Sequence, residues 1–304
     1  MQQEYVIKGE NLSKKFKGFT LDIPELKIPK GFATALIGEN GAGKTTLLNM
    51  ISGIRLDYKG AFTYFGKYSD KDRENKPEVK NKIGYTGPGN YYLPQWTIKQ
   101  VEEVSKLLFD DFDSAKFKNW CDELAISSAS GFTGKKKVSA LSDGTKMKLM
   151  FAGVLSRDTD LLLMDEPASP LDPLMRDKLC EIIRDYLNED EGEHSVFFST
   201  HNISDMENVT DYAIIMENGQ IVEQGFVEDL KEKYVLVKGE KEDADAAKDI
   251  LFSFSSSQYG FEGVCLSENL DKLAGMDITV ETPSLYQISV AVMKAYSRIK
   301  LNKR

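Results

Sequence analysis

The sequence is poor in cysteine and histidine, with three of the former and two of the latter among 304 residues. Cys121, Cys180 and Cys265 are odd in number and far apart, which excludes both a disulfide framework and the close spacing of a cysteine-ligated metal site. We therefore expect three small core side chains in a reducing cytosol.

Long apolar runs are also lacking. No stretch reaches the roughly 18 consecutive apolar residues of a membrane-spanning helix, and residues 1–10 lack the apolar core of a signal peptide. We expect a cytoplasmic chain that reaches a membrane only through a partner.

Positive charge is in the minority, because 39 Lys and Arg face 48 Asp and Glu for a net charge of −9. This balance argues against a general nucleic-acid-binding surface. With 41% hydrophobic and 29% charged residues, the composition is that of a globular protein with a sizeable core. The length exceeds one average domain and is too short for three.

The chain does contain short apolar runs that alternate with amphipathic segments. Each run is apolar on both faces and too short for a helix, which favours buried strands of a parallel sheet. The runs are 32–37, 82–85, 161–164 and 196–199. Helical patterns at 45–51 and 174–187 lie between them. The second helix carries one apolar face, formed by Leu179, Ile182, Ile183, Tyr186 and Leu187. Strands that alternate with helices predict an α/β core.

Two segments depart from this alternation. Helical patterns at 97–109, 117–124 and 145–155 predict a mostly helical insertion between two strands. Later, strands at 212–216 and 220–224 flank Asn218-Gly219, a strong hairpin signal. We expect the core to end near Gly225.

Residues 226–304 predict a small α+β extension. Its expected strands are 234–237, 263–266 and 277–281, and its expected helices are 243–252 and 285–299. Cations gather toward the end of the last helix: Lys294, Arg298, Lys300, Lys303 and Arg304. They either complement the helix dipole or form a surface for lipid headgroups or an acidic partner.

A glycine-rich turn follows the first apolar run and precedes a helix. Gly38-Glu-Asn-Gly-Ala-Gly-Lys-Thr45 matches the P-loop pattern G-x-x-x-x-G-K-[ST]. Its backbone N–H groups and the helix N-terminus cradle phosphate, Lys44 reaches the β- and γ-phosphates, and the Thr45 hydroxyl ligates Mg²⁺. The predicted nucleotide-binding residues here are Gly38, Asn40, Gly41, Ala42, Gly43, Lys44, Thr45 and Thr46.

A pair of acids fits the same site. The buried run at 161–164 ends in Asp165 and Glu166. We expect Asp165 to hold Mg²⁺, usually through water, and Glu166 to polarise the attacking water as general base.

Further elements, in the same order along the chain, resemble the ATPase subunits of ABC transporters. Leu141-Ser-Asp-Gly-Thr145 is similar to their signature motif, usually LSGGQ, which closes on the γ-phosphate held by the other subunit. The resemblance implies that Ser142 and Gly144 contact that phosphate through a hydroxyl and a backbone N–H. Asp143 and Thr145 depart from the common pattern. Because a carboxylate beside a phosphate is costly, we expect Asp143 to face outward.

Three more positions carry the resemblance. Ser169-Pro-Leu-Asp172 resembles the D-loop that crosses the dimer interface, which implies a role for Asp172 at the nucleotide. His201 matches the switch histidine that contacts γ-phosphate and water, which makes it the third expected catalytic residue beside Lys44 and Glu166. Phe16 matches the aromatic that stacks on adenine, although Phe19 lies close and either ring can be core.

One element of the family is missing. A glutamine that links Mg²⁺ to the membrane subunit normally follows the strand after the P-loop helix, but Pro88 stands at that place and Gln95 comes seven residues later. Coupling to a membrane subunit then depends on the aromatic stretch Tyr91, Tyr92 and Trp96, which can equally be core packing.

The resemblance implies a fold and a division of the chain. Residues 1–225 form an ATP-binding domain with a P-loop NTPase core of parallel sheet, an antiparallel β subdomain and a helical subdomain at about 88–155. Residues 226–304 form the α+β extension.

The resemblance also implies an ATPase that uses Mg²⁺, in which two chains, identical or paralogous, meet head to tail around ATP. They would drive a separately encoded transmembrane permease from the inner face of the membrane. The single ATPase domain, the Pro88 loop and the extension are similar to subunits of bacterial exporters of peptides, antimicrobials or drugs. An importer ATPase is the alternative, and so is a soluble ABC ATPase that acts on ribosomes or DNA. About 120 residues separate the P-loop from the acidic pair, too few for the long coiled coil of DNA-repair members.

Overall fold

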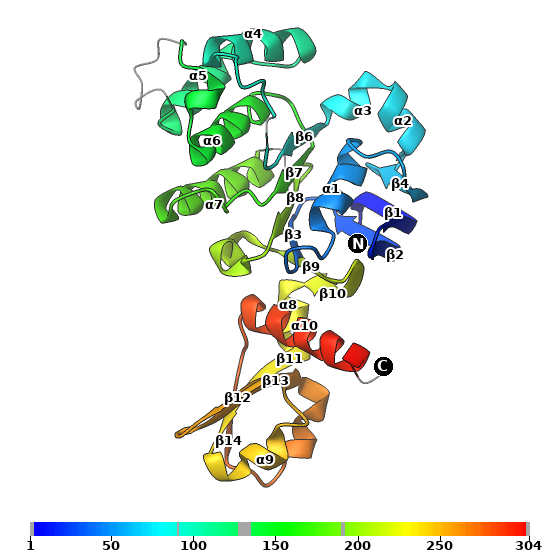
Figure 1. Cartoon of the computed structure of the whole chain (residues 1–304), viewed down its shortest axis with the longest axis vertical. Coiled ribbons are helices and arrows are strands. Elements are labelled where there is room, and N and C mark those ends of the chain that lie inside the picture. Colours follow the sequence, from blue (N-terminus) through cyan, green and yellow to red (C-terminus); the bar gives the residue numbers. More distant parts are fainter. Residues whose placement is uncertain (1–2, 90, 127–134, 190–191, 302–304) are drawn as a thin grey trace.

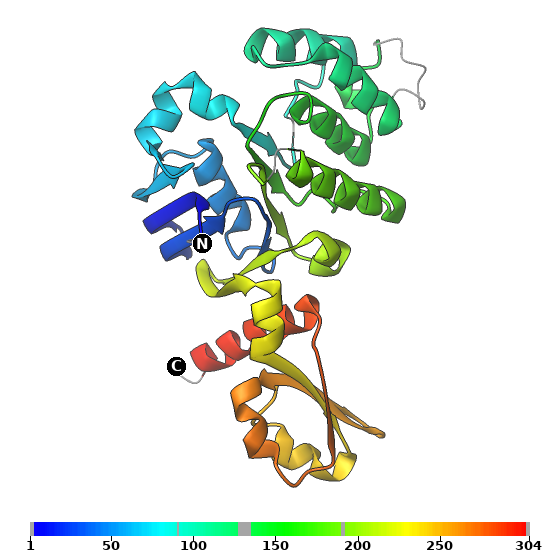
Figure 2. The same ribbon diagram turned by 180° about the vertical axis from the view of Figure 1, so that it is seen from behind.

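The computed structural model describes residues 3–89, 91–126, 135–189 and 192–301, without the side chains of 297–301. It shows an elongated molecule with a helical part at one end, a central sheet, and a small sheet at the other end (Figures 1 and 2). No helix of the described residues has both the length and the apolar character needed to cross a bilayer.

The central sheet has six strands in the order β10-β9-β3-β8-β7-β6. They are β3 (Ala33–Ile37), β6 (Ile83–Thr86), β7 (Leu161–Asp165), β8 (Ser195–Thr200), β9 (Tyr212–Glu217) and β10 (Gln220–Phe226). All pairs are parallel except the β9–β10 hairpin. The predicted parallel strands and hairpin are confirmed. Because neighbouring strands are parallel, their carboxyl ends meet at one edge of the sheet.

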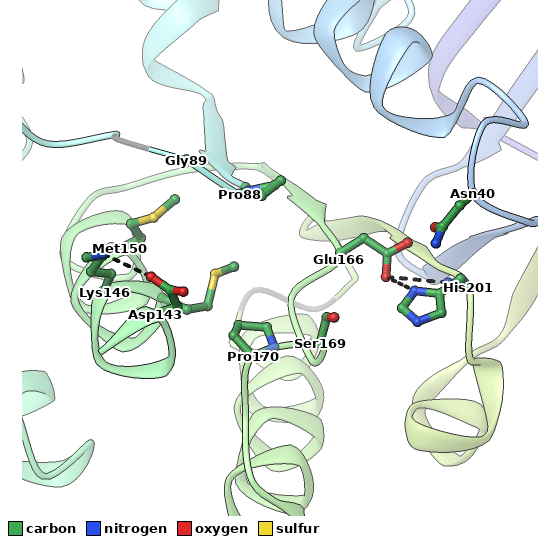
Figure 3. Close-up of a pocket in the computed structure, with 12 residues that line it drawn as sticks. Asn40, Pro88, Gly89, Asp143, Lys146, Met150, Glu166, Ser169, Pro170 and His201 are labelled. Atoms are coloured by element: carbon green, nitrogen blue, oxygen red, sulfur yellow. Dashed lines mark hydrogen bonds and ion pairs between the residues drawn. The ribbon is translucent and has the colours of Figure 1, made fainter. Parts of the chain in front are cut away.

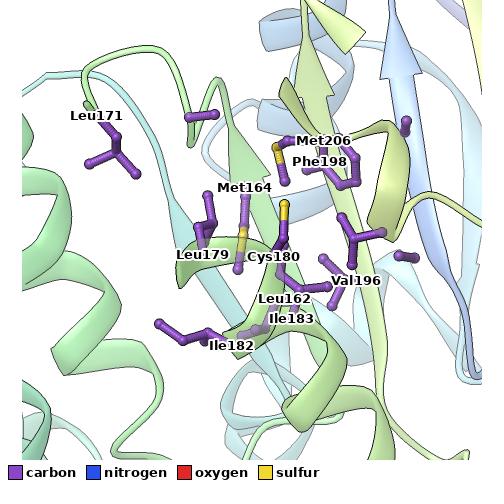
Figure 4. Packing of buried hydrophobic residues seen from close by; sticks show 14 of the residues in the cluster. Leu162, Met164, Leu171, Leu179, Cys180, Ile182, Ile183, Val196, Phe198 and Met206 are labelled. Atoms are coloured by element: carbon purple, nitrogen blue, oxygen red, sulfur yellow. The ribbon is translucent and has the colours of Figure 1, made fainter. Parts of the chain in front are cut away.

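Helices cover both faces of this sheet. Successive side chains of β7 point to opposite faces of the sheet. Leu161 and Leu163 pack on one face with α1 (Lys44–Ser52), whereas Leu162 and Met164 pack on the other face with α7 (Pro173–Asn188). The predicted apolar face of α7 lies against β7 and β8 (Figure 4), and four of its five residues are buried while Leu187 is half-buried. Burial on both faces explains why these strands read as continuous apolar runs.

An antiparallel sheet of order β2-β1-β4-β5 flanks α1. Its strands are β1 (Tyr5–Phe16), β2 (Phe19–Pro29), β4 (Lys59–Tyr64) and β5 (Tyr68–Ser69), followed by α2 (Asp70–Asn75) and α3 (Pro77–Asn81). Apolar residues of β1, β2 and β4 share one core with those of α1. The predicted antiparallel β subdomain is therefore confirmed, and it supports the helix that follows the glycine-rich turn.

The helical insertion consists of α4 (Ile98–Leu108), α5 (Ser114–Glu123) and α6 (Asp143–Val154). Side chains fix where these helices begin: Thr97 and Gln100 form a capping box at α4, and Asp113 accepts two backbone N–H bonds at α5. The three predicted helices are confirmed.

The chain after the hairpin forms a second antiparallel sheet of order β12-β13-β11-β14. Its elements are α8 (Val227–Lys233), β11 (Tyr234–Gly239), α9 (Ala244–Ala247), β12 (Phe252–Ser257), β13 (Gly260–Leu266), β14 (Ile278–Glu281) and α10 (Leu285–Leu301). The prediction of a ten-residue helix at 243–252 is wrong, because only 244–247 are α-helical. The chain turns there so that Leu251 enters the core and Phe252 pairs with Val264.

The last helix does not belong to the small sheet alone. Leu285, Ile288 and Ala291 of α10 are fully buried in the same cluster as Ala213 of β9 and Met164 of β7. In Figure 1, α10 lies between the small sheet and β10. The predicted boundary near residue 225 stays a prediction. The basic end of α10 falls largely outside the described residues, with Lys294 exposed and the other four cations undescribed.

The three cysteines are buried and free. Burial raises the pKa of each thiol, that of Cys121 to about 12. They are core residues, as the sequence predicts.

Candidate functional site

The glycine-rich turn lies at the carboxyl edge of β3 and leads into α1. Gly43 has φ 109°, a left-handed conformation that costs glycine little, and Gly38 approaches the Met216 carbonyl so closely that a Cβ would lie 2.6 Å from its oxygen. Lys44 is buried and its Nζ donates to the carbonyl oxygens of Gly38 and Glu39 at 2.7 and 3.3 Å. The turn therefore wraps around its own lysine.

The other predicted residues of the turn surround this lysine in different states of exposure. Asn40 and Gly41 are exposed, Ala42 is buried, Gly43 and Thr46 are half-buried, and Thr45 is exposed in the first turn of α1. Backbone N–H groups at this helix start face a site where an anion is favoured.

The buried acid lies on the neighbouring strand end. Asp165 is fully buried, its Oδ1 accepts from the Ser199 hydroxyl at 2.5 Å, and its Oδ2 has no hydrogen-bond partner. A buried unpartnered carboxylate oxygen is costly unless a cation or an ordered water satisfies it. This orphaned oxygen and the exposed Thr45 hydroxyl fit a Mg²⁺ site. Among the described residues, no group of three His, Cys, Asp or Glu side chains has the arrangement of a metal cluster.

Glu166 connects the lysine of the glycine-rich turn to His201. Its Oε1 lies 3.3 Å from Lys44 Nζ, and its Oε2 lies 2.7 Å from His201 Nδ1. Its backbone is left-handed at φ 50°, and its N–H donates to Ser199 Oγ at 3.0 Å. A non-glycine residue in this conformation costs about 1–2 kcal/mol, which is a feature of functional sites. The structure thus brings together Lys44, Asp165, Glu166 and His201, as the sequence predicts.

Glu166 and His201 line a cavity of about 590 Å³ that opens to solvent, whereas Lys44 and Asp165 are not among its lining residues. Figure 3 shows Asn40 and His201 on one side, Asp143 and Lys146 of α6 on the other, and Glu166 and Pro170 between them. The remaining lining residues are Gly87, Pro88, Gly89, Met147, Met150 and Ser169. We call residues 38–46 with Glu166 and His201 the phosphate-turn wall, of which Asn40, Glu166 and His201 line the cavity, and we call the start of α6 the second wall.

The predicted signature residues lie at the start of the second wall, and of them Asp143 lines the cavity whereas Ser142 and Gly144 do not. Ser142 caps α6, with its exposed Oγ accepting from the Thr145 N–H at 3.2 Å and lying 2.8 Å from Thr145 Oγ1. Gly144 lies so close to the Pro170 carbonyl that a Cβ would be 2.7 Å from its oxygen. Asp143 is 87% exposed, forms an ion pair with Lys146 at 2.9 Å and lines the cavity, so its expected orientation away from a phosphate held by the other subunit stays a prediction.

The predicted D-loop residue has a structural partner. Asp172 is exposed, and its Oδ1 accepts from the Met175 N–H at 3.1 Å as the N-cap of α7. The structure does not bring Asp172 among the residues that line the cavity.

The two phenylalanines near the turn differ in environment. Phe19 packs against the core of α1 and touches the space beside Gly43, whereas Phe16 is 38% exposed and lies under the cations Arg55 and Lys14 at 5.2 and 5.6 Å from its ring centroid. Phe19 is therefore the core ring, and Phe16 is the ring available to a ligand.

Among the described residues of the loop after β6, no side-chain amide lines the cavity. Pro88 lines the cavity, whereas Gln95 is exposed and does not. Of the aromatic stretch, Tyr92 is buried against Gly153, while Tyr91 is 43% exposed and packs edge-on against Tyr92 at 4.9 Å. Tyr92 is thus a core residue, whereas Tyr91 is partly open to a partner.

Sequence reasoning missed Ser199. It pairs in register with Asp165 across the β7–β8 ladder and holds both the Asp165 carboxylate and the Glu166 backbone. A hydroxyl residue at the end of a predicted parallel strand was the available signal, because parallel strand ends meet at one edge.

Known proteins resemble this chain over most of its length. A family model described as ABC transporter matches residues 21–169. The tungstate uptake system ATP-binding protein of Peptoclostridium acidaminophilum is 30% identical over 215 residues, which cover 70% of this chain and 95% of that protein. A bacitracin transport ATP-binding protein of Enterococcus faecalis is 29% identical over 243 residues, which cover 77% of this chain and 73% of that protein.

Other relatives are longer than the shared part. The match covers 50% of an energy-coupling factor transporter ATP-binding protein of Methanospirillum hungatei, at 31% identity, and 14% of human ATP-binding cassette sub-family A member 6, at 27% identity. Among solved structures, an ATP binding subunit of an ABC transporter aligns with a TM-score of 0.62 at 22% identity and covers 74% of this chain and 92% of that one. At this identity the likeness shows the fold.

Proposed function

The chain belongs to the ATP-binding subunits of ABC transporters, a family of ATPases, and on that premise we propose that it binds and hydrolyses ATP as one half of a head-to-tail dimer. The observation that carries this proposal is the convergence of Lys44, Glu166 and His201 beside the unpartnered Oδ2 of Asp165. At the carboxyl edge of the central sheet, Lys44 would bind phosphate, Glu166 would act as the base with His201 as its partner, and Asp165 would bind the metal.

The chemistry follows from these contacts. A triphosphate is a better partner for Lys44 than the carbonyl oxygens and the single carboxylate that it now contacts, because each phosphate oxygen carries more charge. Asp165 and Thr45 would hold Mg²⁺, which supplies neutralisation of the charge on the phosphates. Glu166 would accept the proton of the attacking water through Oε1 once Lys44 has moved to the phosphates, while His201 keeps Oε2 in place.

The second wall supports a dimer. Ser142 is exposed at the start of α6, so a hydroxyl at this helix N-terminus is available to a second chain. A second chain, identical or paralogous, would bring its own phosphate turn against this wall and receive the reciprocal contact. Loss of the γ-phosphate bridge after hydrolysis would release the pair.

We assign the work of this dimer to transport through a separate transmembrane permease, with the chain on the inner face of the membrane. Exposed apolar side chains lie in the loop before α4 and at the end of α4, where they suit contact with a permease: Tyr91, Leu93, Leu107 and Leu108. Export of peptides or drugs is favoured over uptake, because the bacitracin-transport relative matches a larger share of this chain than the tungstate-uptake relative, 77% against 70%. An importer is the alternative.

Affinity purification from the native host in mild detergent, followed by mass spectrometry, tests this assignment. We expect a multi-span membrane protein in stoichiometric amount. Recovery of ribosomal or DNA-bound proteins without a membrane partner would instead favour a soluble ABC ATPase and would contradict the transport assignment while leaving the ATPase proposal intact.

A further inference from the structure

Arg176, in the first turn of α7, joins two loops that flank the cavity. Its Nε donates to the Leu171 carbonyl oxygen at 3.0 Å, and its Nη1 donates to Asp205 Oδ1 at 2.8 Å. Leu171 belongs to the segment 169–172 beneath the cavity, and Asp205 ends the short 3₁₀ turn Ile203–Asp205 that follows His201. One guanidinium thus holds both loops at once.

Asp205 links Arg176 to Asn202, the residue that follows His201. Its second oxygen, Oδ2, accepts from Asn202 Nδ2 at 3.0 Å, and the Asn202 N–H donates to Thr200 Oγ1 at 3.0 Å. Asn202 is the residue next to His201, whose Nδ1 lies 2.7 Å from Glu166 Oε2. A continuous set of hydrogen bonds therefore connects Arg176 to the backbone that aims the imidazole.

The chemistry of this set requires arginine. The side chains of Arg176 and Asp205 are 29% and 20% exposed, so their ion pair is partly shielded from solvent. A planar guanidinium can donate in two directions with fixed geometry, whereas a lysine ammonium is a single point of charge on a flexible stem. Without the cation, Asp205 would keep one oxygen unpaired and would hold Asn202 less firmly.

We propose that Arg176 is a positioning residue for ATP hydrolysis, acting through Asp205 and Asn202 to keep His201 aimed at Glu166. The proposal rests on the proposed function. Arg176 is not among the residues that line the cavity, and it is bonded to Leu171, next to the lining residue Pro170. Its effect is therefore expected on the turnover step and not on nucleotide binding.

A spectroscopic test does not depend on turnover. The chain has only two histidines, so ¹⁵N-histidine labelling gives two imidazole signals, which His201→Ala assigns. We expect Arg176→Gln to shift the Nδ1 and Nε2 signals of His201 toward values averaged between tautomers, because the Nδ1 contact with Glu166 loosens. Arg184→Gln is the matched control: it removes the same charge from an exposed position on the same helix and should leave both signals unchanged. Unchanged His201 signals in folded Arg176→Gln would overturn the proposal.

Kinetics supply the second readout. In a chain that hydrolyses ATP, Arg176→Gln should lower kcat about tenfold with KM for ATP within about twofold, and should have little further effect in a His201→Ala background. Arg176→Lys keeps the charge but loses the planar guanidinium that donates in two directions, so it should give an intermediate kcat. This variant replaces Arg176→Gln in the test if the glutamine variant does not fold. Kinetics equal to those of Arg184→Gln would contradict the proposal. A native chain without ATP turnover would count against the proposed function instead, and the imidazole signals would still decide the role of Arg176.

Discussion

The two walls of the cavity differ in how completely their polar groups are satisfied within one chain. On the phosphate-turn wall, Lys44 and Glu166 are buried or half-buried and bonded to each other, and Glu166 is further bonded to His201. On the wall formed by the start of α6, Ser142 is exposed and its hydroxyl contacts Thr145 of its own helix turn. One wall is a connected network, and the other is a helix N-terminus that faces solvent.

This difference indicates which wall acts alone. A bonded, buried set of charges holds its geometry without help, so the phosphate-turn wall should bind nucleotide in a single chain. In the proposed dimer, the exposed helix start gains a ligand when a second chain brings one. Substitutions on the first wall should therefore change binding or chemistry directly, whereas those on the second should act only through the dimer.

The largest effect is expected from Glu166→Gln. The amide keeps the size of the side chain but cannot accept the proton of water, so turnover should fall by about 10²–10⁴-fold while ATP still binds. ATP should then hold the two walls together. Gel filtration with ATP should show a dimer for this variant. A monomer under those conditions would break the proposed head-to-tail arrangement.

Lys44→Ala should come next. Removing the buried cation deletes charge-assisted hydrogen bonds worth about 1.5–3 kcal/mol each, so ATP affinity should fall by about 10–100-fold in a binding titration. Lys67→Ala, which removes an exposed lysine of the antiparallel sheet region, should leave affinity unchanged. Unaltered affinity in Lys44→Ala would remove this residue from the phosphate site.

The phosphate-turn wall was also the wall that the sequence predicted best. Its residues are contiguous in short motifs, and each motif stands next to a strand whose apolar run is unmistakable. The position of a strand end thus follows from the sequence within a residue or two. Parallel pairing then places Asp165, Glu166 and His201 at one edge without further information.

Other features needed the three-dimensional structure. The strand Phe252–Ser257 ends in three serines, which have little strand propensity, and it forms because β13 offers backbone partners. Ser199 and Arg176 act through contacts between segments about 30 residues apart, which no local pattern reports. The packing of α10 into the core of the central sheet is likewise a long-range outcome that composition does not predict.

Ser142→Ala tests the second wall. Because this hydroxyl has no partner on the phosphate-turn wall of its own chain, ATP affinity of the single chain should be unchanged. Turnover should fall about tenfold, since one hydrogen bond to a charged phosphate is lost in the dimer. A matched variant, Ser139→Ala, lies just before the motif and should leave turnover unchanged. Weakened ATP binding in Ser142→Ala at concentrations that exclude dimers would contradict the division between the walls.

The smallest effect is expected from Asp143→Asn. The carboxylate is 87% exposed and paired with Lys146, so its field is screened by solvent and by the neighbouring ammonium. If it stays turned away from the nucleotide in the dimer, turnover should change by less than about threefold. If the acid instead faces the γ-phosphate when the walls close, its removal should strengthen ATP-induced dimerisation of the Glu166→Gln chain severalfold. Comparing the ATP concentration at half-maximal dimer for Glu166→Gln with and without Asp143→Asn separates these outcomes, and a large shift would show that the outward orientation of Asp143 is lost on closure.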